Sequence, residues 1–434
     1  MTPTQPTLEP RNRSVTPSSV APVPRYRNPI RVLMVHRNFR LFWLGQTGSV
    51  IGTWMESVAT GWLALKLTNS AFMVGAVAAA GSLPVLLLTL YAGVVVDRRP
   101  KLRLVKTTQS LLLIQAAVLW WFNWSGHITV AWLALLSLVA GSISAFDIPA
   151  RQSLMIELVG REDVVDAIAL NSSGFNVARV IGPALAAIVI DRLGLAWCFA
   201  INSMSFLLVL IGLSMIRLSP EEERVAARNA GLAMGGPMSG LVEGLRFMTG
   251  TRPVVLLMML VAVYSVFGIP FLVMMPVFAQ DVLHGNARTY GALLAAVGIG
   301  AVLGALSLAM VGHRARRGQW LAYASVSFCV FLFLFSFTRT LWVSVPLLAL
   351  VGFAMIQNNA LANGLLQTLS PDHLRGRVMA AYAFVFVGMG PIGSLLAGTV
   401  AQVAGTPVAV GGGALVLLMF AAWVLWVRPE VKRL

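Results

Sequence analysis

The stretch Gly93-Val94-Val95-Val96-Asp97-Arg98-Arg99-Pro100-Lys101-Leu102-Arg103 separates two long apolar runs, residues 71–96 and 104–123. Five charged side chains between two segments of membrane-spanning length cannot lie in lipid. The stretch therefore predicts a tight cytoplasmic turn between two membrane helices. Asp97 falls where the first helix leaves the bilayer, and Gly93 would let two helices approach closely.

The composition of the whole chain agrees with a membrane protein. Of its 434 residues, 58% are hydrophobic and only 11% are charged, whereas a soluble protein carries about 25% charged residues. The net charge of +16 does not indicate a nucleic-acid partner, because no basic soluble domain carries it. Cys198 and Cys329 both lie in apolar runs, so neither a metal site nor a disulfide framework is indicated, and we expect no cofactor.

The apolar segments predict an all-α integral membrane protein with twelve transmembrane helices in two six-helix halves. Each segment approaches or exceeds the roughly 20 residues needed to cross a ~30 Å hydrocarbon core. The expected spans are 41–66, 72–96, 104–123, 129–148, 165–190, 195–216, 253–279, 289–311, 319–337, 341–366, 376–402 and 407–427.

The polar segments divide the chain around these spans. Residues 1–36 are rich in proline and predict a disordered cytoplasmic tail. The two halves are expected at 37–216 and 253–428, joined by a cytoplasmic linker at 217–252, and residues 429–434 form the C-terminal end.

Charge alternates between successive connections. Of 32 lysine and arginine residues, 27 fall on one side of the predicted membrane and four on the other, and Arg179 remains inside a span. The positive-inside rule then predicts that both termini are cytoplasmic in a bacterial inner membrane.

The two halves resemble each other in sequence. Gly182-Pro183 recurs as Gly390-Pro391 at an offset of 208 residues, and Glu157–Asp163 aligns with Gln367–His373 at an offset of 210. Two parallel repeats predict a substrate site between the halves, near the middle of the membrane.

Five polar residues share one face of the first predicted helix, at successive spacings of three and four: Gln46, Ser49, Thr53, Glu56 and Thr60. A polar stripe in a membrane helix is expected to face the bundle interior or a water-filled cavity. Glu56 would then carry a proton, meet a cationic group of a substrate, or serve as a hydrogen-bonded structural carboxylate.

The fifth predicted helix carries Asn176 and Arg179. We expect Asn176 to line the substrate cavity and Arg179 to be a charged residue of the cavity that, with Glu56, takes part in proton coupling. A buried guanidinium needs an anionic partner or several acceptors, and Glu56 is the obvious candidate in the same half. Such a pair would be either a switch between two states or a permanent scaffold.

In the second half, three consecutive amides at 357–359 cannot share one helix face, so at least one of them must face a neighbouring helix. Asn359 and Asn363 lie four residues apart, and they either line the cavity or bond helix to helix.

The opening stretch resembles the loop between helices 2 and 3 of the major facilitator superfamily. That pattern reads glycine, three residues, Asp-Arg, one residue, glycine, then two basic residues. Four positions match it: Gly93, Asp97, Arg98 and Lys101. Pro100 replaces the second glycine, and Arg103 completes the basic pair after Leu102. The resemblance implies that this loop locks the two halves in the outward-facing state; the alternative is a loop whose charges only set topology.

The fifth helix is similar to the helix 5 motif of drug–proton antiporters, with alanine at several glycine positions. Small residues permit close packing, and Gly182-Pro183 would permit a bend. The resemblance favours export. The fourth helix lacks the intramembrane arginine that those antiporters use for proton coupling, so their coupling mechanism does not transfer directly.

The stretches 145–152 and 171–179 are similar to a bacterial branch of the superfamily that includes the enterobactin exporter and related secretion transporters. In this branch, an acid near the inner end of helix 4 joins the loop charges. The resemblance therefore assigns Asp147 to a cytoplasmic cluster with Asp97, Arg98 and Arg103.

Together these features predict a transporter and not an enzyme. We expect a monomer that exports small amphipathic molecules, either drug-like compounds or siderophores, by alternating access and proton antiport. The alternatives are a nutrient uptake transporter and a non-transporting sensor or assembly protein on the same fold. The chain contains no phosphate-binding loop, so the energy must come from an ion gradient or from the gradient of the substrate.

Overall fold

The computed structural model describes residues 29–160, 162–217, 246–311 and 317–427, and these are almost entirely helical. The first half contains α1 (Pro29–Val35), α2 (Arg37–Thr68), α3 (Ala71–Arg98), α4 (Lys101–Trp124), α5 (Val130–Val159), α6 (Val164–Arg192) and α7 (Leu195–Ser214). The second half contains α10 (Arg252–Val263), η1 (Tyr264–Gly268), α11 (Phe271–Val277), η2 (Phe278–Val282), α12 (Ala287–Val311), α13 (Arg317–Ser336), α14 (Leu341–Leu369), α15 (Asp372–Gly388), α16 (Gly390–Ala404) and α17 (Thr406–Val427).

Eleven helical segments of the described chain are long and apolar enough to cross a membrane, and they correspond to eleven of the twelve predicted spans. We assign α2 as the remaining predicted span. Its 32 residues reach about 48 Å at 1.5 Å per residue, and its polar stripe lowers its mean hydropathy. One boundary of the predicted tail needs correction. Residues 29–35 form the helix α1, and Val32 of that helix is buried against the first half.

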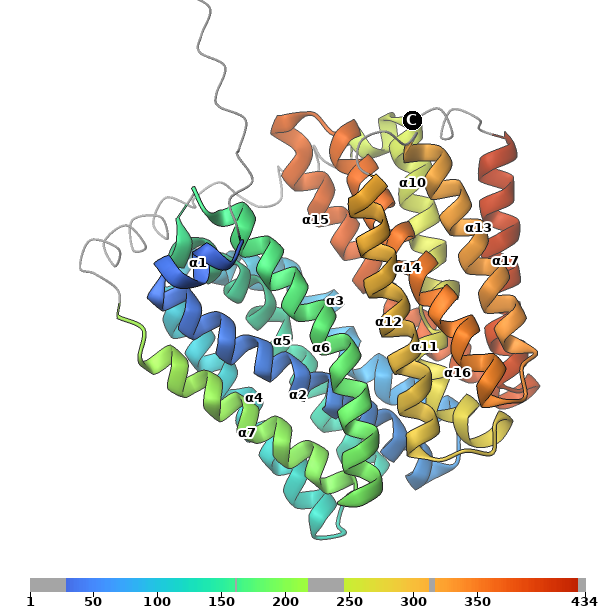
Figure 1. Ribbon diagram of the computed structural model, residues 1–434, viewed down its shortest axis with the longest axis horizontal. Helices are drawn as coiled ribbons and strands as arrows, with labels where there is room; N and C mark the ends of the chain where they lie inside the picture. Colours follow the sequence, from blue (N-terminus) through green and yellow to red (C-terminus); the bar gives the residue numbers. More distant parts are fainter. Residues whose placement is uncertain (1–28, 161, 218–245, 312–316, 428–434) are drawn as a thin grey trace, which may run out of the picture.

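The two halves stand side by side as separate bundles and diverge toward one face of the molecule (Figure 1). We call this the terminal face, because α1 begins and α17 ends there, and we call the opposite one the far face. Between the halves, α3 packs against α16 and α6 packs against α12.

The hydrophobic core follows the same division. The largest cluster of buried apolar side chains includes Met55 and Trp62 from the first half and Phe278 and Phe335 from the second, so it joins the two halves toward the far face. Nearer the terminal face there are two separate clusters, one around Leu154 in the first half and one around Leu366 in the second. Within the described part of the chain, the buried apolar cluster that the two halves share therefore lies on the far side.

Glycines set the closest approaches between helices within each half. A Cβ atom at Gly300 or Gly304 of α12 would meet the backbone of α14 at Ala349 or Phe353, so this glycine pair lets the two helices pack closely. Gly141 of α5 faces the backbone of Gly81 in α3 in the same way. The corresponding helix pairs of the two halves, α3 with α5 and α12 with α14, are thus both packed closely through glycines.

The second half departs from regular helices at two predicted spans. The span predicted at 253–279 contains the π-helical turns η1 and η2, and the span predicted at 376–402 is divided into α15 and α16 at Met389. Prolines lie beside these interruptions, at Pro270, Pro276 and Pro391. A proline supplies no backbone N–H and clashes with the preceding turn, so the regular bonding pattern breaks there.

Candidate functional site

A cavity of about 730 Å³ lies between the two halves. Helices α2 to α7 supply most of its lining, and α11 and α12 supply the remainder, through Leu272, Val273, Tyr290, Leu294 and Val297. A cavity of this volume lies within the ~300–1,000 Å³ range of small-molecule sites. Most of the lining surface is apolar, and the polar groups are concentrated on the first half.

The predicted polar stripe of α2 runs along this cavity. All five of its residues line the wall: Gln46, Ser49, Thr53, Glu56 and Thr60. Gln46 and Ser49 are buried, and the hydroxyl of Thr53 donates to the backbone oxygen of Ser49 at 3.0 Å. The regular spacing along one helix face places these groups together, as the sequence predicts.

Glu56 is held by two amide side chains from other helices. The Nδ2 of Asn202 (α7) donates a short hydrogen bond to one carboxyl oxygen, and the Nε2 of Gln115 (α4) donates to the other at 3.4 Å. A Cβ at Gly52, one turn before Glu56, would lie 2.6 Å from both the Asn202 Oδ1 and the Ser205 Oγ. The absence of a side chain at Gly52 therefore leaves space for Asn202 to reach the Glu56 carboxylate.

Sequence reasoning did not find these two amides. Each is an amide side chain within a predominantly apolar stretch of its helix, and that was the available signal. Its meaning depends on which helix face points at Glu56, and a single sequence does not state that.

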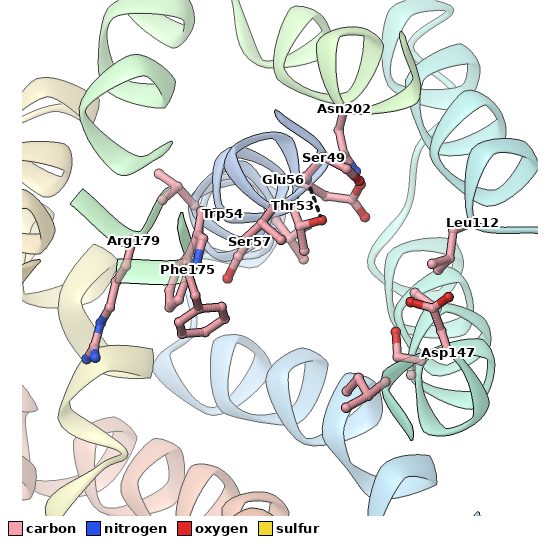
Figure 2. A pocket seen from close by; sticks show the side chains of 18 of the residues that line it. Ser49, Thr53, Trp54, Glu56, Ser57, Leu112, Asp147, Phe175, Arg179 and Asn202 are labelled. Carbon is pink, nitrogen blue, oxygen red and sulfur yellow. Dashed lines mark hydrogen bonds between the residues drawn. The ribbon is translucent and has the colours of Figure 1, made fainter. Parts of the chain in front are cut away.

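The predicted pair between Glu56 and Arg179 is wrong for this conformation. Figure 2 shows the two side chains on different sides of α2, with Glu56 beside Asn202 and Arg179 beyond Trp54. The Nη2 of Arg179 lies 3.5 Å from the Sδ of Met355 in α14, and its Cζ lies 5.9 Å from the centre of the Trp54 ring. Arg179 therefore contacts the second half, while amides satisfy Glu56.

Asp147 also lies elsewhere than predicted. Its carboxylate is only 1% exposed and accepts hydrogen bonds from the Thr108 hydroxyl at 2.6 Å and the Gln109 amide at 3.0 Å. The Nε of Arg151 lies 2.6 Å from its other oxygen. The predicted cluster with Asp97, Arg98 and Arg103 is absent from this conformation.

The reason for this difference is helix length. The sequence-based boundary ended the fourth span at residue 148, whereas α5 continues through Pro149 to Val159. Asp147 therefore lies twelve residues, or about 18 Å, inside the helix end. The loop charges lie at the surface, beyond its reach.

Asp147 is expected to stabilise the first half. Replacing Asp147 by asparagine leaves Arg151 without its ionic partner, and we expect the free energy of unfolding to fall by about 1–3 kcal/mol. Denaturation in mixed detergent micelles measures the change. The matched control is Asp97→Asn in the exposed loop, for which we expect a change within about 0.5 kcal/mol. Equal effects of the two substitutions would contradict the assignment.

The other predicted locking residues lie at the terminal face, as expected from the loop. Asp97, Arg98 and Arg103 are exposed, and no described residue bonds the Asp97 carboxylate. The Nζ of Lys101 donates to the backbone oxygens of Asp97 and Arg99 at 3.2 and 3.3 Å, so it fixes its own turn. A Cβ at Gly93 would meet nothing within 4 Å, so the close approach that we predicted there is not made in this conformation.

Three predicted cavity amides lie outside the lining of this cavity. Asn176 donates to the backbone oxygen of Ser172 in its own helix, and Asn363 accepts a bond from Gln367. Asn359 is half-buried elsewhere on α14. The expectation that one of the amides at 357–359 faces a neighbouring helix is confirmed. Gln357 bonds Ser307 of α12, and Asn358 accepts from Ser325 of α13.

Gly182 and Pro183 lie at a crowded point of α6. A Cβ at Gly182 would collide with the Trp54 side chain, and the backbone oxygen of Pro183 lies 3.0 Å from the position of a Cβ at Gly291 in α12. α6 continues through both residues without interruption. Close packing on both sides is therefore evident, and the bend remains a prediction.

Polar contacts join the halves at the far face. Ser70 donates to Gln402 at 2.8 Å, Gln280 donates to Asn69 at 3.1 Å, and Arg288 forms a close ion pair with Asp191. At the terminal face, the contacts of His36 with Asp163 and of Asn38 with Arg217 stay within the first half. The far side is thus closed in this conformation.

Curated relatives cover most of the chain. It is 28% identical over 360 residues to the multidrug efflux pump Tap of Mycolicibacterium fortuitum, covering 82% of this chain and 87% of that protein. It is 25% identical over 408 residues to the enterobactin exporter EntS of Shigella flexneri, covering 93% and 95%. The staphyloferrin A transporter of Staphylococcus aureus is 23% identical, with 82% and 87% covered.

Solved structures show the same fold. A bacterial homologue of the human lysosomal transporter Spinster, solved in an inward-facing and unoccupied conformation, superposes with a TM-score of 0.67 at 13% identity, covering 93% of this chain and 96% of that one. A peptide transporter of the POT family reaches a TM-score of 0.69 at 12% identity, covering 94% and 99%. Residues 31–433 match the family described as transmembrane secretion effector. This chain, a multi-pass integral membrane protein, belongs to that family of major facilitator transporters.

Proposed function

We propose that this protein is a secondary active exporter that moves small amphipathic molecules, drug-like compounds or siderophores, out of a bacterial cell by alternating access. It acts as a monomer in the inner membrane, and proton antiport drives it. The observation that carries this proposal is the cavity between the halves, which is closed toward the far face and contains a carboxyl group on its wall.

The direction of transport follows from charge and from the relatives. The excess of lysine and arginine in the connections supports a cytoplasmic terminal face. The conformation described here is then inward-facing, with the cavity ready to load from the cytoplasm. The names of the relatives Tap and EntS support export over uptake.

Glu56 is the proton-carrying group in this proposal. An ionisable side chain at membrane depth is expensive and marks a functional pathway by default. Two neutral amides hold it, not a fixed cation, so it can gain or lose a proton without leaving an opposite charge unpaired.

The loop at the terminal face acts as the lock in the opposite conformation. Gly93, Asp97, Arg98 and Arg103 meet the second half when that face closes, and Lys101 keeps the turn in shape. Asp147 supports the lock from within the first half through its bond to Arg151.

Replacing Glu56 by glutamine should abolish proton-coupled export. Inverted membrane vesicles with an imposed pH gradient and a pH-sensitive dye report proton movement when ethidium or a catecholate siderophore is added. We expect a substrate to dissipate the gradient with the native protein and at most one tenth as fast with Glu56→Gln. The matched control is Glu157→Gln, which removes an acid from α5 outside the cavity lining and should leave the response unchanged.

Two outcomes would count against this function. If Glu56→Gln dissipates the gradient as fast as the native protein, Glu56 does not carry the proton. If neither protein responds to any compound although both are folded and inserted, proton antiport is wrong.

A further inference from the structure

Arg179 is a cation at the depth of the cavity without an acidic partner. Among the described residues its guanidinium contacts the thioether of Met355 and the ring of Trp54, and both of these contacts are weak. The ion pairs of the described chain lie elsewhere, and Glu56 is engaged by Asn202 and Gln115. A guanidinium group away from water is strongly stabilised by an anion that accepts hydrogen bonds from its N–H groups.

Aromatic rings lie next to this cation on the cavity wall. Phe175 precedes Arg179 by four residues on α6, so both project from the same helix face. The Phe175 ring is 50% exposed and packs edge-on against Trp54 with ring centres 5.9 Å apart. Both rings line the cavity, and Figure 2 shows them between Arg179 and the polar residues of α2.

We propose that this wall of the cavity binds a substrate by an acidic group next to an aromatic ring. Arg179 donates hydrogen bonds to the carboxylate or phenolate, and the ring of the substrate packs on Phe175 and Trp54. The inference rests on the proposed export function and names its substrate class. It separates two tasks, because Glu56, on a different side of α2, remains available for the proton.

The site also couples the two halves. Arg179 and Phe175 belong to the first half, and Met355, which Arg179 contacts, belongs to the second. A substrate on this wall also faces the α11 and α12 residues that line the cavity, so its binding depends on how the halves are arranged. Substrate release then follows when the halves move apart on the far side.

Three naphthalene compounds with matched rings test the proposal: 1-naphthoate, 1-naphthylmethanol and 1-naphthylmethylamine. Their binding to the purified full-length protein in lipid nanodiscs is measured by isothermal titration at pH 7. We expect the acid to bind at least tenfold more tightly than the alcohol or the amine. Arg179→Gln should remove this preference by weakening the acid at least tenfold with little change for the alcohol.

Further variants separate charge from ring contacts and from folding. Arg179→Lys keeps the charge and should retain part of the preference for the acid. Phe175→Ala should weaken the binding of the acid and of the alcohol by similar factors. Size-exclusion profiles of each variant establish that it is folded, and Arg179→Lys replaces Arg179→Gln as the decisive variant if the glutamine protein does not fold.

Other results overturn the proposal. Equal binding of the three compounds, binding of none of them, or unchanged acid binding in the Arg179 variants each rejects it. Preference for the amine that Glu56→Gln abolishes would assign the substrate charge to Glu56 instead. The vesicle assay tests proton-coupled export independently of this binding experiment. Selective acid binding without proton-coupled transport would reject the transport function and support the site. Coupled transport without a preference for the acid would support the transport function and reject the site.

Discussion

Replacing Gly352 by alanine should destabilise the second half severely. The added Cβ would overlap the carbonyl oxygen of Val297 and lie within 2.9 Å of its Cα. The obstacle is backbone, so no side-chain rotation relieves it and α12 and α14 must separate. We expect the free energy of unfolding to fall by about 3 kcal/mol, which denaturation in mixed micelles measures.

The same helix provides a matched control. A Cβ at Gly364 of α14 would meet nothing within 4 Å. Gly364→Ala should therefore be neutral or stabilise the protein by up to about 1 kcal/mol through helix propensity alone. If Gly352→Ala and Gly364→Ala unfold at the same denaturant concentration, the tight contact between α12 and α14 is not a determinant of stability.

Replacing Gly75 by alanine should change the conformation instead of unfolding the protein. A Cβ there would collide with the carbonyl oxygen of Ser394 and lie 3.2 Å from the Cα of Gly398, both in the other half. Two halves that move as bodies relieve this clash by separating on the far side. We expect the ratio of far-open to far-closed molecules to rise at least tenfold, which corresponds to about 1.4 kcal/mol.

A cross-link on the other seam reports this shift. Asp191 and Arg288 form an ion pair between α6 and α12 at the far face, so Asp191→Cys with Arg288→Cys should join readily through a short bifunctional thiol reagent. The native Cys198 and Cys329 are buried and do not compete. Gly75→Ala should lower the cross-linked fraction although it touches neither position.

Gly81→Ala on the same helix is the control for this experiment. Its Cβ would make only ordinary contacts with Ser137 at 3.7 Å, within the first half. It should leave the cross-linked fraction unchanged. A normal cross-linked fraction in Gly75→Ala would show that the contact between α3 and α16 does not hold the far face closed.

Proteins with this architecture reveal their fold in a single sequence because lipid imposes one rule on every span. Backbone polar groups in a bilayer must bond within their own segment, so apolar length alone predicts the helices. The predicted spans match the observed helices for this reason. The errors occur where length is a poor guide: α5 continues eleven residues past its predicted end, and Pro29–Val35 is helical.

The polar stripe of α2 was predictable for a related reason. Its five residues recur at helical spacing on one element, so their common face follows from helix geometry alone. Partners on other elements did not follow. Glu56 meets Asn202 and Gln115, not Arg179, because the rotation of α4, α6 and α7 about their axes decides which side chains point inward.

Four features could be predicted from the sequence alone: the helices, the resemblance of the two halves, the charge bias of the connections and the polar face of α2. These are local properties, set by periodicity and by the cost of placing polar groups in lipid. Three features could not be predicted in this way: Asp147 pairs with Arg151, Arg179 reaches toward Met355, and the far face is closed. Those outcomes depend on how helices rotate and how two halves pack, and the packing energies are shared among residues that lie far apart in the chain.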